Sequence, residues 1–330
     1  MSAPSLPRVV RGFMWVDYFL IMPVLARLSW GAALWWGRRR GDLLYCWRRV
    51  GRRAAVANLL HAYAGRLNAR EARRIARRAY QAQTCEEAET FLFGALRREE
   101  FRAFVRVEGQ EHLEHALARG RGAIVFSLHY GSLCLAMIAL AYIGYRVNVL
   151  ARSIAEEENP LQAPVRRYAA RKVADLERIL GRPFIIAGAP DAMLRVRRAL
   201  KEGEIVYVLL DVPPELANRR VRVRFLGHPA ELPHGAELIA KASGAALLPF
   251  VVRRNADGRT HTFRMGAEVP VVEGGESVLQ RCIDELEGEI RADPSQFFMW
   301  EFARSFWIDE GPVGTIDHTD GMQAAGGGAA

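Results

Sequence analysis

Apolar and polar residues follow two different patterns along the chain. Between residues 68 and 98, apolar residues recur three and four positions apart, and Asn68 with Glu71 three residues later has the arrangement of a helix cap. This pattern predicts one long amphipathic helix with an arginine-rich first half. From residue 105 onward, short β-branched apolar runs alternate with helical stretches, which is typical of an α/β domain.

Four apolar runs predict buried strands. They are nearly continuous, as expected for the strands of a parallel sheet that helices cover on both faces. Gly203 and Gly244 follow two of the intervening helical stretches, at positions where helices commonly end. The sequence therefore predicts an α/β fold with a mixed, mostly parallel central sheet flanked by helices. The predicted strands are residues 123–128, 146–151, 204–210 and 246–252, and the predicted helices are residues 112–120, 132–143, 189–203 and 234–244.

Residues 13–36 are rich in large apolar and tryptophan side chains. The run is long enough to cross a bilayer, but Asp17, Pro23 and Arg27 interrupt it, and charges near the middle of a membrane are costly. A helix or broken helix in the membrane interface fits this pattern better than a spanning helix. A signal peptide fits less well, because the positive charge follows the apolar run and no small-residue cleavage site is evident. An ordinary buried first helix with a solvated arginine face is the other interpretation.

Tryptophans and arginines extend this interfacial pattern. Trp30, Trp35 and Trp36 are placed for the headgroup belt of a bilayer. A cationic collar follows, of the kind that holds a protein on an anionic cytoplasmic leaflet. The sequence thus predicts an N-terminal membrane-associated helix. The collar consists of Arg38, Arg39, Arg40, Arg48, Arg49, Arg52 and Arg53.

We divide the chain into three parts on this basis. Residues 1–60 are expected to form the membrane-anchoring segment, and residues 61–312 the α/β domain. Residues 313–330 end in the low-complexity stretch GMQAAGGGAA and are expected to be a disordered tail.

The formal net charge is +9, and arginine supplies nearly all of the positive charge, since Lys172, Lys201 and Lys241 are the only lysines. Such a field attracts anionic partners, namely phospholipid headgroups, an acidic carrier protein or nucleic acid. No helix-turn-helix, zinc or RNA-binding signature accompanies the charge, which disfavours nucleic acid. The four cysteines lack the spacing of a zinc site or a redox pair.

Two predicted strands end in residues that carry acid–base chemistry. His129 follows the strand at 123–128, and Asp211 follows the strand at 204–210. Ligands bind beyond the carboxyl ends of strands in open parallel sheets, so these side chains would meet at one edge if the strands are neighbours. A neutral imidazole can take a proton from an attacking hydroxyl or amine, while a carboxylate fixes its tautomer. A satisfied structural histidine is the other interpretation of His129.

The neighbouring residues suit an anionic group. Gly131 permits close backbone approach, Ser132 is placed to cap the next helix, and the start of that helix offers N–H groups to a developing oxyanion. Arg253 and Arg254 end the strand at 246–252 on the same edge, where they meet either an anionic substrate or solvent. This edge of the predicted sheet is therefore the candidate site.

The sequence around His129 resembles a known family. The run IVFSLHYGSLCLA is similar to the histidine motif of the lysophospholipid acyltransferase superfamily, in the branch of late (lauroyl- and myristoyl-type) acyltransferases of lipid A biosynthesis. The likeness extends from about residue 10 to residue 310. The blocks that resemble this branch, in the same order, are NLLHAYAGRLNAREARRIARRAY, RVEGQEHLEHALARGRGAIVFSLHYGS, ARSIAEEENP, VRVRFLGHPAELPHGAELIAKASGAALLPFVVRR and DPSQFFMWEFAR.

This resemblance implies a glycerolipid acyltransferase-like fold and an enzyme on the cytoplasmic face of a cell inner membrane. It implies transfer of a fatty acyl chain from acyl carrier protein or acyl-CoA to a hydroxyl or amine of an anionic lipid or glycolipid, with His129 as general base and with neither metal nor cofactor. Arg152 lies where the family has an arginine, after the strand that follows the histidine helix, and there it would contact phosphate or carbonyl oxygens. A surface arginine beside the acidic residues 156–158 is the alternative.

One position departs from the family motif, which has an aspartate or glutamate five residues after the histidine. Cys134 occupies that position. In one explanation Asp211, or less favourably Glu215, supplies the carboxylate and Cys134 packs as a small apolar residue. In a second, Cys134 is a nucleophile that accepts the acyl chain, as in a thioesterase or a two-step transferase of a specialised pathway. In a third, the protein binds lipid or carrier protein without turnover.

Overall fold

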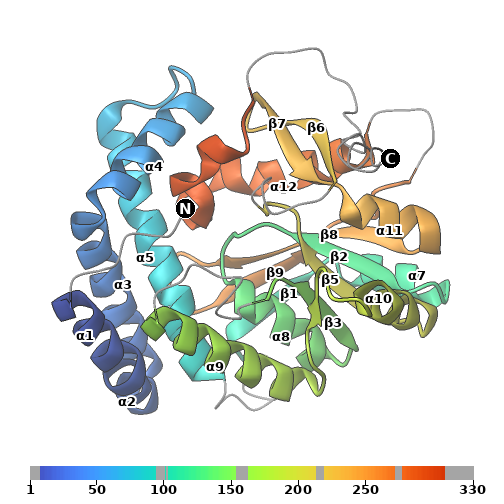
Figure 1. The fold of residues 1–330 in the computed structure, drawn as a ribbon, viewed down its shortest axis with the longest axis horizontal. Helices are drawn as coiled ribbons and strands as arrows, with labels where there is room; N and C mark the ends of the chain where they lie inside the picture. The colour runs from blue at the N-terminus through green and yellow to red at the C-terminus, as the bar shows by residue number, and fades with distance from the viewer. Residues whose placement is uncertain are drawn as a thin grey trace, which may run out of the picture.

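A seven-stranded sheet is the centre of the computed structural model, which describes residues 8–93, 101, 103–153, 163–212, 219–271 and 277–308. Neighbouring strands pair parallel from β8 to β4, β8 and β9 pair antiparallel, and β9 and β1 pair parallel. The predicted mixed, mostly parallel sheet is therefore confirmed. In spatial order the strands are β1 (Val105–Glu108), β9 (His261–Met265), β8 (Ala246–Arg254), β2 (Ala123–Ser127), β5 (Ile205–Leu209), β3 (Val147–Ala151) and β4 (Ile185–Ile186) (Figure 1).

Both faces of this sheet are buried, as the continuous apolar strands predict. Along β2, Ile124 and Phe126 belong to one apolar cluster, and Ala123 and Val125 belong to another on the opposite face. The first cluster includes side chains of α4 (Arg49–Ala62), α10 (Ala192–Lys201), α11 (Gly235–Ser243) and α12 (Val278–Ala292). The second includes side chains of α7 (Gln110–Ala118), α8 (Leu133–Ile143) and α9 (Ala163–Leu180). Helices α7, α8, α10 and α11 coincide with the four predicted helices.

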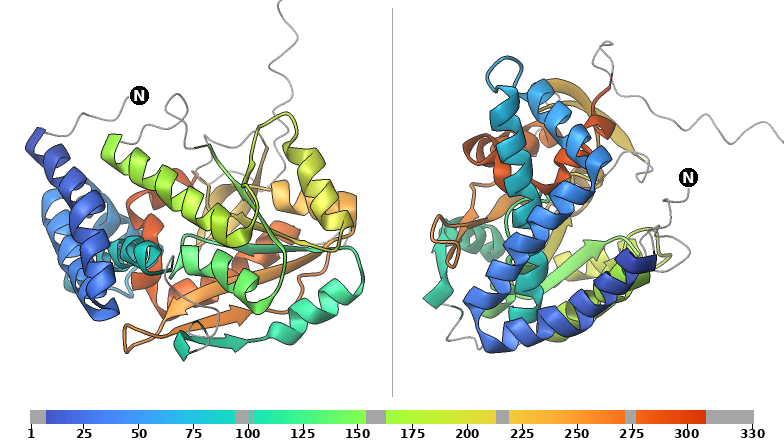
Figure 2. Two further views of the ribbon diagram at one scale, coloured as in Figure 1. Left: turned by 90° about the horizontal axis from the view of Figure 1, so that it is seen from below. Right: turned by 90° about the vertical axis from the view of Figure 1, so that its left-hand side faces the viewer.

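The N-terminal helices stand to one side of the sheet (Figures 1 and 2). They are α1 (Arg8–Val16), a π-helical turn (Asp17–Ile21), α2 (Met22–Leu28), α3 (Trp30–Trp47), α4 and α5 (Ala69–Phe93). Helix α5 is the long helix expected after Asn68. The predicted cap is confirmed, because Oδ1 of Asn68 accepts the Glu71 N–H at 3.0 Å and the Glu71 carboxylate accepts the Asn68 N–H at 3.1 Å.

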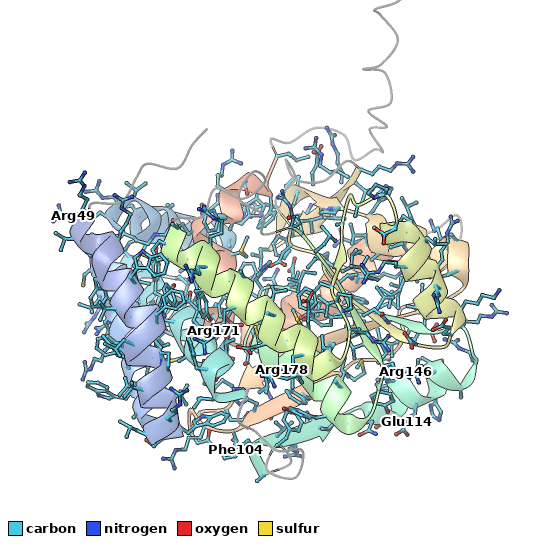
Figure 3. The ribbon with its side chains drawn as sticks, turned by 60° about the horizontal axis from the view of Figure 1, so that its bottom comes forward. Arg49, Phe104, Glu114, Arg146, Arg171 and Arg178 are labelled. Carbon is cyan, nitrogen blue, oxygen red and sulfur yellow. The ribbon has the colours of Figure 1, made fainter. Side chains whose placement is uncertain are left out.

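Helix α9 crosses the sheet over α8 and reaches α1 (Figure 2). Arg171 and Arg178 lie along this helix and are exposed (Figure 3). Tyr168 and Leu176 are buried, and Lys172, which lies between them at a spacing of four residues, shares their face. The inner face of α9 therefore carries one cation.

Two further parts of the fold close the site region. Strands β6 (Arg220–Phe225) and β7 (His228–Pro233) form an antiparallel hairpin beside the main sheet. After α12 the chain forms short 3₁₀ turns at Pro294–Gln296, Phe298–Glu301 and Ala303–Ser305. Buried aromatic residues hold this C-terminal segment against the core; they are Phe297, Trp300, Phe306 and Trp307.

The N-terminal segment differs in part from the expected interfacial helix. One helix, Arg8–Leu28, is long and apolar enough to cross a membrane by length and composition, and 22% of its apolar window is buried. Asp17 does not face lipid: its carboxylate is buried, 2.5 Å from the Arg40 guanidinium and 2.7 Å from the Trp36 indole nitrogen. Asp17 therefore ties α1 and α2 to α3 instead of merely interrupting an apolar run.

Two members of the predicted headgroup belt are half-buried against the protein, and one member of the collar is buried. Trp36 bonds Asp17, and Trp30 stacks on Phe104 with ring centroids 4.8 Å apart. Arg40 is buried between Asp17 and Glu87. Among the three tryptophans, Trp35 is the exposed one. The predicted tail at 313–330 lies outside the described residues.

Candidate active site

His129 and Asp211 meet at the carboxyl edge of the two central strands. Strands β2 and β5 pair in parallel register, with Ser127 opposite Leu209, and each side chain follows two residues further on. Nδ1 of His129 lies 2.9 Å from Oδ1 of Asp211, and the His129 backbone N–H donates to Oδ2 at 2.8 Å. The Asp211 side chain is fully buried, whereas 31% of the His129 side chain is exposed. The sequence-based expectation that these two residues meet is confirmed.

This contact determines what the imidazole can do. The buried carboxylate accepts a hydrogen bond from the Nδ1–H, so Nε2 is the nitrogen that can accept a proton from another molecule. Burial alone would lower the pKa of His129, but the charge and the hydrogen bond of Asp211 outweigh burial and raise the pKa above its ordinary value. An imidazole held in this way can accept a proton at Nε2.

The loop after His129 is fastened to two other elements. The His129 carbonyl accepts the Phe298 N–H at 2.9 Å, and the Gly131 N–H donates to the Gln296 carbonyl at 2.9 Å. Gly131 has φ +65°, and a Cβ atom there would lie 1.7 Å from the Val252 carbonyl oxygen. A glycine is therefore required at position 131 because strand β8 packs directly against the loop. This packing fixes the backbone that carries the imidazole.

The expected oxyanion donors are already engaged. The Gly131 N–H bonds Gln296, the Ser132 N–H donates to the Val252 carbonyl at 2.9 Å, and the Cys134 N–H donates to the Glu86 carboxylate at 3.3 Å. Ser132 is fully buried, and its hydroxyl donates to Glu89 at 2.5 Å. In this structure Gly131 and Ser132 thus shape the loop and do not present donors to a substrate.

Cys134 is enclosed in the first turn of α8. The residue is 1% exposed, and burial, followed by the charge of Glu86, raises the pKa of its thiol well above the ordinary value. A buried neutral thiol is a poor nucleophile. Lys172 reaches the same place from α9, with Nζ 3.0 and 3.1 Å from the two carboxylate oxygens of Glu86.

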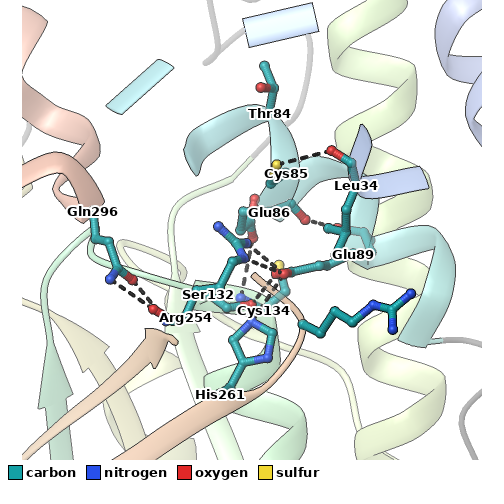
Figure 4. Close-up of polar contacts among 12 residues, drawn as sticks. Leu34, Thr84, Cys85, Glu86, Glu89, Ser132, Cys134, Arg254, His261 and Gln296 are labelled. Carbon is teal, nitrogen blue, oxygen red and sulfur yellow. Dashed lines mark hydrogen bonds and ion pairs between the residues drawn. The ribbon is translucent and has the colours of Figure 1, made fainter. Parts of the chain in front are cut away.

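A second buried carboxylate, Glu89, lies one turn further along α5 (Figure 4). The Arg254 guanidinium donates to it from Nε at 2.9 Å and from Nη2 at 2.6 Å, and Nε2 of His261 lies 3.1 Å away. Burial would raise the pKa of Glu89, but Arg254 and His261 lower it to about 2. Arg254 therefore belongs to an internal network and is not available to a substrate.

Sequence reasoning missed this acidic part of α5. Glu86, Glu87 and Glu89 form a compact acidic run inside an otherwise uncharged half of the helix, and this run is the signal that the sequence offers. Each of the three is matched by a cation from another element: Lys172, Arg40 and Arg254.

The remaining predicted site residues have different positions. Arg152 directly follows β3, whose carboxyl end lies at the same edge as that of β5, and its side chain is exposed. Arg253 is partly exposed, with Nη1 3.5 Å from the Glu289 carboxylate. Glu215 lies outside the described residues.

A separate cavity of about 400 Å³ opens between the end of α4, the start of β7 and the C-terminal segment. His61 and His228 stack there with ring centroids 3.8 Å apart, beside Trp307 and Arg304. Neither His129 nor Asp211 lines this cavity. Within the described ranges, no three His, Cys, Asp or Glu side chains are grouped so that they could hold a metal ion.

A mostly parallel α/β sheet with a histidine–carboxylate contact at its carboxyl edge is an arrangement with which enzymes activate a nucleophile by removing its proton. The family model of the bacterial lipid A biosynthesis acyltransferases matches residues 9–303, which is nearly the whole chain. The protein belongs to this family and is an acyltransferase. Comparison with curated protein sequences finds no significant match.

Proposed function

We propose that the protein transfers a fatty acyl chain from a thioester donor, acyl carrier protein or acyl-CoA, to a hydroxyl or amine of a lipid A-type glycolipid, with His129 as general base. The observation that carries the proposal is the His129–Asp211 contact, with a buried carboxylate on Nδ1 and a partly exposed ring. Family membership supports the acyl transfer and the glycolipid class of acceptor.

The reaction follows from this arrangement. Nε2 of His129 takes the proton of the acceptor hydroxyl as its oxygen attacks the thioester carbonyl carbon. Asp211 stabilises the imidazolium that forms. The tetrahedral intermediate then collapses, the C–S bond breaks, and the imidazolium returns its proton to the leaving thiolate. An ester and a free thiol result, and no metal or cofactor takes part.

The N-terminal helices provide an exposed surface for contact with the membrane that contains such a substrate. Val16, Leu20, Val24 and Leu28 expose large apolar side chains along the continuous helix Arg8–Leu28, and Trp35, Leu43 and Trp47 do so on α3. Arg38, Arg39, Arg48, Arg49 and Arg53 are exposed around them. An apolar face with a basic border is suited to the cytoplasmic leaflet of an anionic inner membrane.

A two-step mechanism through Cys134 has less support. Its thiol is buried and neutral, and the backbone N–H beside it is engaged by Glu86. Asp211 already fills the role of the orienting carboxylate, so Cys134 is not needed for either step of the direct transfer.

The proposed function is tested by an activity assay of the purified protein with acyl carrier protein or CoA thioesters and a lipid A precursor. We expect His129→Ala to abolish transfer, while His115→Ala, a change of an exposed histidine on α7, leaves transfer intact. In parallel, lipids of a deletion strain should include a species lighter by one acyl chain. Unchanged turnover in His129→Ala would refute the role of the base, and an unchanged lipid profile would refute the acceptor class.

A further inference from the structure

Glu86 and Lys172 form a buried ion pair beside the loop that carries the proposed base. Helix α5 delivers the Glu86 carboxylate to the first turn of α8, where Oε1 accepts the Cys134 N–H at 3.3 Å. Helix α9 delivers the Lys172 ammonium, 3.0 and 3.1 Å from both carboxylate oxygens. The Glu86 side chain is 5% exposed and the Lys172 side chain 21%. Direct acyl transfer by His129 makes no use of either residue.

Packing alone does not account for this pair. Moving two charges out of water costs several kcal/mol per ion before their attraction offsets it, so apolar residues of similar volume are often as stabilising. The choice of cation is also unusual for this chain, in which three of 46 basic residues are lysines. An ammonium is a compact point charge, whereas a guanidinium is a wide planar fork, so a lysine at this position suits a confined site.

The ion pair lies at the first turn of α8, the helix that begins four residues after His129, so both charges lie near the loop that carries the imidazole. The negative charge of Glu86 favours the protonated imidazole and the positive charge of Lys172 disfavours it, in addition to the larger effects of burial and Asp211. Burial alone would lower the pKa of Lys172, but its pKa lies well above the ordinary value, and the charge of Glu86 favours the ammonium. The thiol of Cys134, by contrast, is neutral. The charged groups beside Cys134, the fifth residue after His129, are therefore Glu86 on α5 and Lys172 on α9.

We propose that Glu86 and Lys172 are positioning residues for His129: Glu86 supplies from α5 the carboxylate that position 134 lacks, and Lys172 balances its charge. This inference rests on the proposed role of His129 as base. It predicts that the two residues move the protonation of the base in opposite directions.

The test is the pH profile of kcat/KM for Glu86→Gln and Lys172→Met. The neutral imidazole is the active form, so activity rises with pH through the pKa of His129. Loss of the Glu86 charge is expected to move this rise to lower pH by about 0.5 to 1 pH unit, and loss of the Lys172 charge to higher pH by a similar amount. Glu86→Asp keeps the negative charge and should keep the rise of activity near its original pH.

Two further variants separate electrostatics from simple damage. Cys134→Asp in the Glu86→Gln background places a carboxylate next to Lys172 from α8. In this double variant, the rise of activity with pH should move back toward its original position. Lys241→Met, which removes the matched Lys241–Glu237 pair on α11, should leave the profile unchanged.

An NMR titration of the His129 ring, assigned by its loss in His129→Ala, gives the same information without turnover. If the pKa of His129 moved in the same direction in Glu86→Gln and Lys172→Met, or in neither variant, the inference would be refuted. Because Lys172 is partly exposed, Lys172→Met provides the decisive measurement if Glu86→Gln does not fold. An active His129→Ala variant would instead refute the proposed function, while the titration would still report the coupling.

Discussion

At the scale of single residues, Asp211 is held by two bonds to the same residue. Its Oδ1 faces Nδ1 of His129 and its Oδ2 accepts the backbone N–H, so the carboxylate orients both the ring and the strand end that carries it. No rotation of the ring about its Cβ bond preserves both contacts. Asp211 is therefore one of the residues that orient the proposed base.

Asp211→Asn should lower kcat by about 10²- to 10⁴-fold, the range that a positioned base contributes. An amide can donate to Nδ1 and so favour the wrong tautomer. Loss of the negative charge also removes the main effect that raises the pKa of His129, so the remaining activity should rise at lower pH than in the parent protein. Steady-state kinetics across pH provide the measurement, and a parent-like kcat would contradict the assignment of Asp211.

Cys134→Ser should keep most of the activity. The thiol is buried and neutral, and serine differs little from it in volume. Intact-mass spectrometry after incubation with a thioester donor should show no acyl adduct on the parent protein. An adduct that disappears in Cys134→Ser, together with loss of turnover, would establish the two-step route instead.

The sequence predicted one half of this site and not the other. His129 and Asp211 each follow a continuous apolar strand, and parallel strands end at one edge, so their meeting follows from local pattern and topology. Glu86, Glu89 and Lys172 lie on amphipathic helices whose rotation relative to the sheet is set by tertiary packing. No spacing between them and His129 encodes this contact.

At the scale of elements, the loop after β2 illustrates how closely strands and turns are matched. Gly131 brings the backbone against β8. The N–H groups of Gly131 and Ser132 both donate hydrogen bonds to neighbouring segments. A side chain at position 131 would separate the loop from β8. The orientation of the imidazole thus depends on a residue without a side chain.

Gly131→Ala should lower the free energy of unfolding by more than about 2 kcal/mol, because a positive φ and a backbone overlap add. Gly188→Ala is a matched control, since Gly188 also has positive φ but an added Cβ there meets no atom within 4 Å. Urea denaturation of both variants provides the comparison. Equal losses would show that the contact with Val252 is unimportant.

Several elements were not predicted although their patterns are present. In β6, Val221, Val223 and Phe225 alternate with arginines, which indicates a strand with one buried face, but such a strand contains no continuous apolar run. Helices α9 and α12 have buried residues at helical spacing. The neighbourhood of β2 and β8 could not be deduced, because these strands are separated by more than 100 residues and pair only in the folded sheet.

At the scale of the whole molecule, the apolar helices and the site are parts of one packed body. Glu87 on α5 accepts the Tyr18 hydroxyl at 3.1 Å and pairs with Arg40, which in turn holds Asp17. The N-terminal segment therefore has one face committed to the protein and the other exposed. This division supports a helix that lies along a membrane surface.

The variant Leu20→Asp/Val24→Asp should weaken binding to anionic phospholipid vesicles about tenfold or more, because two exposed apolar side chains lose their place in the bilayer. Leu194→Asp changes an equally exposed leucine on α10 and should leave binding intact. Vesicle co-sedimentation at low and high salt measures both. A loss of binding in Leu194→Asp, or none in the double variant, would place the membrane surface elsewhere.

The acidic residues of α5 have a consequence for changes in chain length. Successive residues of an α-helix are rotated by about 100°, so Glu86, Glu87 and Glu89 point toward three different neighbours at once. One added or deleted residue among them would leave the helix intact and yet misdirect at least one carboxylate. We therefore expect residues 86–89 to tolerate no insertion, whereas the exposed turn at 64–66, which leads into the same helix, should accept them.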